Sequence, residues 1–238
     1  MNGRCFAATS LLVPRFFSAA TSTMSSTKRG ALIVLEGCDR SGKSSQANKL
    51  VEKFNLEGTA CNHLRFPDRT TTIGTLINDY LQQKSQIEDH VIHLLFSANR
   101  WEFAQTIKSK LKKGINIIID RYAYSGVAFS AAKQGMDINW CKQSDVGLPR
   151  PDLVLFLDIS PERAAERSGY GDEIYESLEL QNKVYANYLK LKERNWKLVN
   201  ADRKFDEVHA ELVGHIHNAI NSIKDTHITG LWKPNHKS

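Results

Sequence analysis

Short apolar runs and longer stretches of helical spacing alternate along most of the chain. Ala31–Glu36, Ile115–Ile119 and Leu153–Leu157 are continuous apolar runs. Between them, apolar residues recur at intervals of three and four, which is typical of helices with one buried face. Continuous strands of five or six residues that alternate with helices indicate a parallel sheet covered by helices on both faces.

The remaining segments follow the same alternation. A weaker strand is expected at 60–66 and a short one at Lys197–Val199. Helices are expected at about 43–55, 72–82, 88–112, 123–134, 161–167, 175–194 and 204–224. No repeat or internal linker interrupts the pattern. The sequence therefore predicts a three-layer α/β fold with about five parallel strands, and a single domain over residues 28–238.

A glycine-rich loop follows the first apolar run and opens the first helix. Its residues are Gly37, Cys38, Asp39, Arg40, Ser41, Gly42, Lys43 and Ser44, followed by Ser45. They match GxxxxGK[ST] at every fixed position, in the strand–loop–helix context that this phosphate-binding motif requires. Backbone N–H groups of such a loop surround phosphate oxygens, and the helix N-terminus adds positive potential. Lys43 is expected to reach the β and γ phosphates of ATP, and the Ser44 hydroxyl to ligate Mg²⁺.

A second polar element ends the strand at 115–119. Asp120 and Arg121 directly follow its last apolar residue. The carboxyl ends of parallel strands border the ligand crevice of such sheets. Asp120 is therefore predicted to hold the metal shell together with Ser44, and Arg121 to direct guanidinium donors at transferred phosphate. The alternatives are a helix-capping Asp and a surface ion pair.

The chain lacks the marks of several other P-loop classes. Its two Asn-Lys pairs are followed by Leu50-Val51 and Val184-Tyr185, so the guanine-reading NKxD motif is absent. The apolar run at 115–119 is followed by Asp120-Arg121, and not by the Asp-Glu pair that is typical of helicases and transporter ATPases. The class that remains is the small phosphotransferases of the P-loop NTPase fold.

Longer matches carry a resemblance to one family. They include LEGCDRSGKSSQ (35–46), FPDR (66–69), HLLFSANRWE (93–102), DRYAYSGVAF (120–129) and GLPRPDLVLFLD (147–158). Over nearly all of 30–233 the chain resembles the thymidylate kinases. The resemblance implies transfer of the ATP γ-phosphate to dTMP with Mg²⁺, which supplies dTTP for DNA synthesis, and it implies a homodimer formed through the long helices, part of 88–112 included.

The resemblance also assigns the acceptor site. Arg69, with Phe66 beside it in the FPDR motif, would bind the dTMP phosphate bidentately. Phe96 would stack on thymine and Arg100 would donate to its O4, because residues i and i+4 share a helix face. From the residues alone, Phe96 is interpreted as a core residue, because it lies in an apolar stripe with Ile92 and Leu95.

Further residues are assigned in the same way. Ser125, Gly126 and Phe129 would form the floor of the base pocket, and Ser125 reads either as a contact to the pyrimidine edge or as an intrahelical hydrogen bond. Tyr175 would pack beneath the sugar and exclude a 2′-hydroxyl, with Gln181 as a weaker candidate on the same helix. Asp39 would face the sugar 3′-hydroxyl. Glu36 is either a supporting acid of the site or a buried structural acid.

The resemblance further suggests which arginine neutralises the transferred phosphate. Members with a basic residue in the P-loop usually lack one in the lid. The expected lid at 168–174 has no Lys or Arg, so Arg40 is the candidate clamp on the γ-phosphate. Arg167 would stack on adenine or contact its phosphates. With Arg40, the residues Lys43, Arg121, Asp120 and Asp39 form the predicted catalytic set.

Two other functions stay open at this stage. One is another small phosphotransferase, such as a UMP/CMP kinase or a deoxynucleoside kinase. The other is a nucleotide-binding scaffold without catalysis, which the intact Lys43 and Asp120 disfavour.

Charge and composition add information about the N-terminus. The net charge is +6, yet residues 30–238 carry 28 basic and 26 acidic groups, so no nucleic-acid partner is expected. No apolar run is long enough for a membrane span. Residues 1–27 are rich in Ser, Thr and Ala and contain no acid, which is typical of a mitochondrial transit peptide; a disordered tail is the alternative. Cleavage is expected after Phe17. A start at Met24 would give a cytoplasmic and nuclear form.

Overall fold

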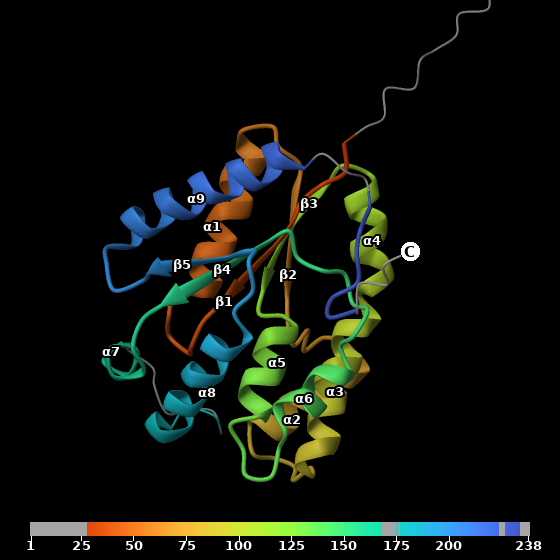
Figure 1. Ribbon diagram of the computed structural model, residues 1–238, viewed down its shortest axis with the longest axis vertical. Helices are drawn as coiled ribbons and strands as arrows, with labels where there is room; N and C mark the ends of the chain where they lie inside the picture. The colour runs from red at the N-terminus through yellow and green to blue at the C-terminus, as the bar shows by residue number, and fades with distance from the viewer. Residues whose placement is uncertain (1–27, 168–174, 176, 224–226, 234–238) are drawn as a thin grey trace, which may run out of the picture.

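Five parallel strands form one twisted sheet at the centre of the molecule (Figure 1). The computed structural model describes residues 28–167, 175, 177–223 and 227–233. The strands are β1 (Leu32–Glu36), β2 (Cys61–Arg65), β3 (Asn116–Asp120), β4 (Leu153–Asp158) and β5 (Trp196–Asn200), in the spatial order β2-β3-β1-β4-β5. The three central strands are the continuous apolar runs of the sequence, and all residues of β1 and β3 are buried. The predicted three-layer α/β fold is confirmed.

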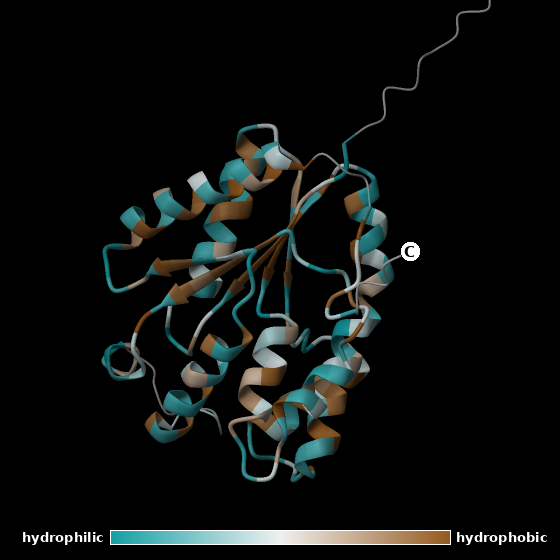
Figure 2. Cartoon of the chain, in the orientation of Figure 1, coloured by the Kyte–Doolittle hydropathy of each residue, from teal (hydrophilic) through white to brown (hydrophobic). Residues whose placement is uncertain are grey.

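Helices cover both faces of this sheet. They are α1 (Lys43–Leu56), α2 (Thr72–Leu81), α3 (Asp89–Glu102), α4 (Ala104–Lys112), α5 (Ala123–Ser130), α6 (Ile138–Gln143), α7 (Pro161–Ala165), α8 (Leu178–Leu191) and α9 (Phe205–Ser222). Alternate side chains of β1 point to opposite faces. Ile33 and Leu35 pack in the core beneath α1 and α9, whereas Leu32 and Val34 pack in the core beneath α4, α5 and α8. Figure 2 shows the central strands as largely apolar between these two layers.

Two helical segments differ from the sequence expectation. The helix expected at 88–112 divides into α3 and α4, because the Phe103 N–H bonds the carbonyl of Arg100, three residues back, and its ring packs edge-on against Phe66 at 5.6 Å. Helix α6 was not predicted. The Asp137 side chain accepts a hydrogen bond from the N–H of Trp140 and caps this short helix.

The carboxyl ends of the central strands meet at one edge of the sheet. Strand β1 leads into the P-loop at Gly37, β3 ends at Asp120, and β2 leads into Phe66. Residues far apart in the sequence therefore converge there. In the part of the chain that the structure describes, no helix combines the length and apolarity that a membrane span needs.

Candidate active site

A cavity of about 610 Å³ opens at this edge of the sheet. It has the size of a small-molecule site. The predicted residues that line it are Asp39, Arg40, Gly42, Lys43, Ser44, Ser45, Phe66, Arg69, Phe96, Arg100, Arg121, Ser125, Gly126, Phe129, Arg167 and Tyr175. Gly37, Cys38, Ser41, Asp120 and Gln181 are not in its lining, but they stand directly behind it in the P-loop, at the end of β3 and on α8.

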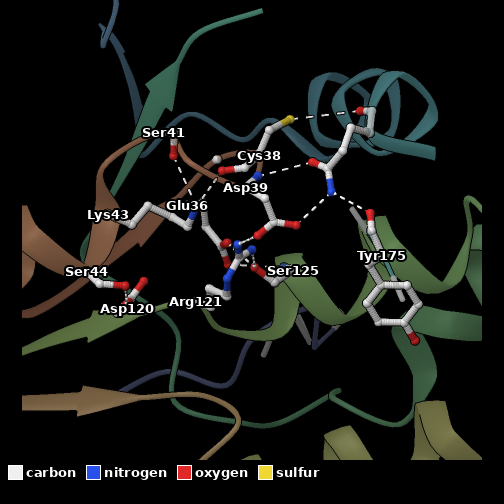
Figure 3. Close-up of polar contacts among 12 residues, drawn as sticks. Glu36, Cys38, Asp39, Ser41, Lys43, Ser44, Asp120, Arg121, Ser125 and Tyr175 are labelled. Carbon is white, nitrogen blue, oxygen red and sulfur yellow. Dashed lines mark hydrogen bonds and ion pairs between the residues drawn. The ribbon is translucent and has the colours of Figure 1, made fainter. Parts of the chain in front are cut away.

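The P-loop backbone closes around the Lys43 ammonium group. Lys43 is 4% exposed, and its Nζ donates to the Cys38 carbonyl at 2.6 Å and to the Ser41 hydroxyl at 3.1 Å (Figure 3). Gly37 has a φ of 143°, and a Cβ there would lie 2.7 Å from the Leu157 carbonyl oxygen. Burial and, next to it, the nearby charge of Arg121 lower the pKa of Lys43 to about 8. The loop therefore holds a buried amine that phosphate oxygens would stabilise as a cation.

Cys38 has a different environment from a reactive thiol. It is 1% exposed, and burial raises its pKa to about 12. Because the thiolate is the redox-active form, the burial of Cys38 favours its role as an inert small residue of the loop.

Ser44 and Asp120 form the pair expected of a metal site. The Ser44 hydroxyl lies 2.5 Å from Asp120 Oδ2, and Asp120 is 1% exposed. Its other oxygen, Oδ1, is buried and has no hydrogen-bond partner among the described residues. A buried carboxylate oxygen without a partner, next to a serine hydroxyl, fits the hard oxygen ligands that Mg²⁺ prefers. Other ligands would come from phosphate and water.

Asp39 and Arg121 form an ion pair across the cavity between the P-loop and the end of β3 (Figure 3). The Gln181 side chain of α8 holds Asp39 twice, since its Nε2 donates to Asp39 Oδ2 at 2.7 Å and its Oε1 accepts from the Asp39 N–H at 3.1 Å. Burial would raise the pKa of Asp39, but the charges of Arg121 and Lys43 together lower it. Asp39 is therefore ionised and oriented.

Glu36 is a buried carboxylate behind this pair. It accepts hydrogen bonds from the N–H groups of Tyr122 and Ser125 at 2.9 and 3.1 Å, and from the hydroxyls of Ser125 and Tyr188 at 2.5 and 3.1 Å. Burial raises its pKa, which the Ser125 hydrogen bond and the charge of Arg121 oppose. The Ser125 hydroxyl thus donates to Glu36, and not to a backbone carbonyl of its own helix.

Aromatic and basic side chains form the opposite wall. Phe66 is 3% exposed and packs against Phe103 and Tyr122, so it supports the wall from within the core. Arg69 donates from Nη1 to Asn78 Oδ1 at 3.1 Å. Phe96 is half-buried and packs against the small cluster formed by α2 and α3. Arg100 is 2% exposed and pairs with the buried Asp145.

Tyr175 closes one side of the cavity. Its ring lies 5.5 Å from that of Phe129 and 6.1 Å from that of Tyr80 on α2. Lys133 Nζ stands over the Tyr175 ring at 5.1 Å, and the Tyr175 carbonyl accepts a hydrogen bond from Gln181. Tyr175 is thereby held between Phe129 on α5 and Gln181, the side chain that also binds Asp39 of the P-loop.

Arg167 crosses from the last turn after α7 to the P-loop. It donates to the Arg40 carbonyl at 2.9 Å and to the Ala201 carbonyl at 2.7 Å, just beyond β5. Arg40 itself has a left-handed backbone, with a φ of 61°. The expected lid, 168–174, lies outside the described residues, as do 1–27 with the expected transit peptide.

Three residues of this neighbourhood were not predicted. Asp145 holds Arg100, Tyr188 holds Glu36, and Arg65 places its Nε 3.7 Å from Asp120 Oδ2. Arg65 stands directly before the FPDR motif, so its place in the chain could have drawn attention to it. Neither Asp145 nor Tyr188 belongs to a local pattern, because only the packing of α6 and α8 brings them to the site.

Comparisons with known proteins identify the family. A family model described as thymidylate kinase matches residues 35–212. The chain is 49% identical to a thymidylate kinase of Danio rerio over 87% of this chain and 100% of that protein. It is 48% identical to one of Homo sapiens over 87% of this chain and 99% of the relative, and 56% identical to one of Arabidopsis thaliana over 82% and 74%.

A solved structure gives the same result for the fold. Thymidylate kinase from Candida albicans superposes with a TM-score of 0.74 and is 40% identical, covering 80% of this chain and 92% of that one. Together with the P-loop, the Asp-Arg pair at the end of β3 and the cavity between them, these similarities show that the chain belongs to the thymidylate kinase family.

Proposed function

We propose how the residues of the cavity divide the work of a dTMP kinase. The protein transfers the γ-phosphoryl group of ATP to dTMP and releases ADP and dTDP, as its family membership implies. The reaction needs no covalent enzyme intermediate, so the chain acts by positioning two phosphates and neutralising their charge.

The P-loop side binds ATP. Backbone N–H groups of 37–45 bind the β and γ phosphates, and the Lys43 ammonium group donates hydrogen bonds to them. Ser44 and Asp120 would hold Mg²⁺, which supplies charge neutralisation at the phosphate oxygens. Support comes from the partnerless Asp120 Oδ1 beside the Ser44 hydroxyl. Arg167, tied to the P-loop and to the residue after β5, borders the adenine side.

The opposite wall binds dTMP. Arg69 receives its phosphate, Phe96 stacks on the base, and Arg100 donates to the carbonyl at its far edge. Ser125, Gly126 and Phe129 line the floor. Tyr175 packs beneath the sugar and leaves no room for a 2′-hydroxyl. Support comes from the observation that all seven of these residues line one cavity.

Transfer takes place where the two walls meet. Arg40 and Arg121 neutralise the charge that develops on the transferred group. Asp39, oriented by Gln181 and Arg121, accepts a hydrogen bond from the sugar 3′-hydroxyl. An aligned acceptor reduces the entropy cost of in-line attack.

The observation that carries this assignment is a single cavity lined by both Lys43 and Arg69. The test is coupled ADP release by the full chain with ATP and Mg²⁺, across dTMP, dUMP, UMP, CMP, AMP and thymidine. We expect strong preference for dTMP. Preference for UMP or thymidine would overturn the acceptor assignments, and no release with any acceptor would favour the scaffold interpretation.

We also infer a homodimer formed through α3. Val91 and Leu94 lie one turn apart on this helix and are each 48% exposed, as is Leu76 on α2. Apolar side chains grouped on a helix face favour a contact with another chain.

We further infer that residues 1–27 direct the long form to the mitochondrion, and that a start at Met24 gives a cytoplasmic and nuclear form. Support comes from four basic residues and no acid in 1–29. The test is imaging of the full chain and of a Met24-start chain in cells. Identical distributions would contradict the inference.

A further inference from the structure

Asp145 is a fully buried carboxylate that no step described above uses. It lies in the turn after α6 and is 0% exposed. Its two oxygens accept hydrogen bonds from Arg100 Nε at 3.0 Å and from Arg100 Nη2 at 2.6 Å. The Ser97 hydroxyl of α3 lies 2.8 Å from Asp145 Oδ1 and 2.9 Å from the Ser144 carbonyl oxygen, so that its one proton is shared between these two acceptors. The carboxylate is thus fixed from two directions, and it binds Arg100 in bidentate geometry.

Gly126 confines the same guanidinium from another side. A Cβ at this position would lie 2.7 Å from Arg100 Nη2 and 2.8 Å from Nη1. The guanidinium therefore fills the space that a side chain on α5 would take. It is 2% exposed and still forms part of the cavity lining. Asp145 on one side and Gly126 of α5 on the other therefore restrict where the planar group can lie.

This position determines what Arg100 can recognise. A guanidinium carries five N–H donors and no acceptor. Asp145 engages one N–H of Nε and one of Nη2, which leaves three donors, two of them on Nη1, for a ligand. A fixed donor fork can pair with a carbonyl oxygen on a base but not with an exocyclic amine, whose hydrogens would face its own.

We propose that Asp145 is a positioning residue that makes Arg100 a rigid reader of a carbonyl at the base edge, and thereby excludes aminopyrimidines such as cytosine. The proposal rests on the proposed function, because it requires the base to occupy the wall that contains Arg100. A site built around a fixed hydrogen bond discriminates strongly against a ligand that cannot form it, since buried donors are left unpaired. A mobile arginine would turn aside and lose this discrimination.

Asp145→Asn tests the proposal, because it keeps the shape of the side chain and presents one donor group to Arg100. A single orienting hydrogen bond remains. We expect the KM for dTMP to rise about tenfold, as for loss of one hydrogen bond to a charged group. The inhibition constant of dCMP against dTMP should stay within about twofold, so that the preference for dTMP over dCMP falls about tenfold. The KM for ATP should not change.

Asp152→Asn is the matched control. Asp152 also binds an arginine in bidentate geometry, since Arg29 Nη1 and Nη2 donate to it at 2.8 and 2.7 Å, but it precedes β4 at the other edge of the sheet. The Asp152→Asn variant should have a lower melting temperature than the wild type and the same preference for dTMP over dCMP. If Asp145→Asn folds too poorly to assay, Ser97→Ala removes a hydroxyl from the carboxylate and should lower the preference about threefold.

Arg100→Lys separates this inference from the proposed function. If Asp145 acts through Arg100, adding Asp145→Asn to Arg100→Lys should not raise the KM for dTMP further. If Arg100→Lys raises this KM and Asp145→Asn does not, the inference is wrong and the acceptor wall stands. Equal losses of dTMP and dCMP binding in Asp145→Asn also overturn the inference. If neither variant affects dTMP binding, both the inference and the assignment of Arg100 fall.

Discussion

Individual side chains in this site owe their chemistry to burial and to backbone conformation. Arg40 sits in the P-loop with a φ of 61°, a conformation that most residues adopt only at a cost. Lys43 is buried in the P-loop between the Cys38 carbonyl and the Ser41 hydroxyl, and its pKa is lowered to about 8. Both features arise where the chain must turn sharply from β1 into α1, and both lead to measurable consequences.

Arg40→Gly should lower turnover by about a hundredfold or more, because it removes a cation from the transferred phosphate. The fold should tolerate the change, since glycine accepts a positive φ. The affinity for ATP should fall much less, since the loop N–H groups and Lys43 remain. The measurement is kcat against the ATP dissociation constant. A variant with unchanged kcat would remove Arg40 from the mechanism.

The Lys43 pKa predicts a pH dependence of ATP capture. Below about 8 the free enzyme carries a charged Lys43, and above it the neutral amine predominates. The value of kcat/KM for ATP should therefore fall as the pH rises through this value, because that parameter reports the free enzyme. The kcat should respond less, since bound phosphates raise the lysine pKa. A flat kcat/KM profile above pH 8 would show that Lys43 stays charged.

At the level of elements, a side chain of one strand fixes the start of a helix from another part of the chain. Tyr122, at the N-cap of α5, offers no side-chain cap to its own helix. Glu36 at the end of β1 caps this helix instead, because it accepts hydrogen bonds from the N–H groups of Tyr122 and Ser125. Arg121 lies directly before this helix with a φ of 67°, and its Nη1 donates to the hydroxyl of Ser125, the same residue that Glu36 holds.

Glu36→Gln should lower the free energy of unfolding by about 2 kcal/mol, because an amide group would face donors that the carboxylate accepts. It should also lower kcat, since Arg121 loses its fixed direction. Urea unfolding and steady-state kinetics measure the two effects. Tyr188→Phe removes one of the donors and serves as the control, with an expected loss of about 1 kcal/mol. Equal stability of wild type and Glu36→Gln would contradict this role.

At the scale of the whole molecule, the cavity and the exposed apolar surface of α2 and α3 lie in different regions. The edge at the strand carboxyl ends holds the cavity, whereas α2 and α3 extend away from the sheet and expose apolar side chains (Figure 1, Figure 2). Because α3 also carries Phe96 and Arg100, a partner packed on its outer face would stiffen the wall that is assigned to dTMP.

The double variant Val91→Glu/Leu94→Glu should be monomeric, whereas the wild type should sediment as a dimer, because two carboxylates cannot be buried at a self-contact without partners. Analytical ultracentrifugation makes the comparison. The same substitutions on an exposed part of α9, Ala210→Glu and Asn218→Glu, control for added charge. A wild-type monomer, or a double variant that stays dimeric, would contradict the assigned interface.

The sequence alone determined the features that depend on local order. Periodicity identified the central strands, because a strand buried on both faces must be apolar along its length. The P-loop and Asp120 followed from fixed spacing at strand ends, and resemblance supplied the residues around the acceptor. The sequence predicted one helix at 88–112 where the structure has two, because the break at Phe103 depends on the packing of its ring against Phe66.

Tertiary structure decided which buried groups hold the site in place. Asp145 is 45 residues from Arg100, and Tyr188 is 152 residues from Glu36. Neither stands in a motif, and each reaches its partner only because helices pack on the sheet in this order. A buried charge must find its partner wherever the fold brings one. Sequence spacing therefore predicts which groups are candidates for ligand contact, and three-dimensional packing determines which buried groups hold those side chains in place.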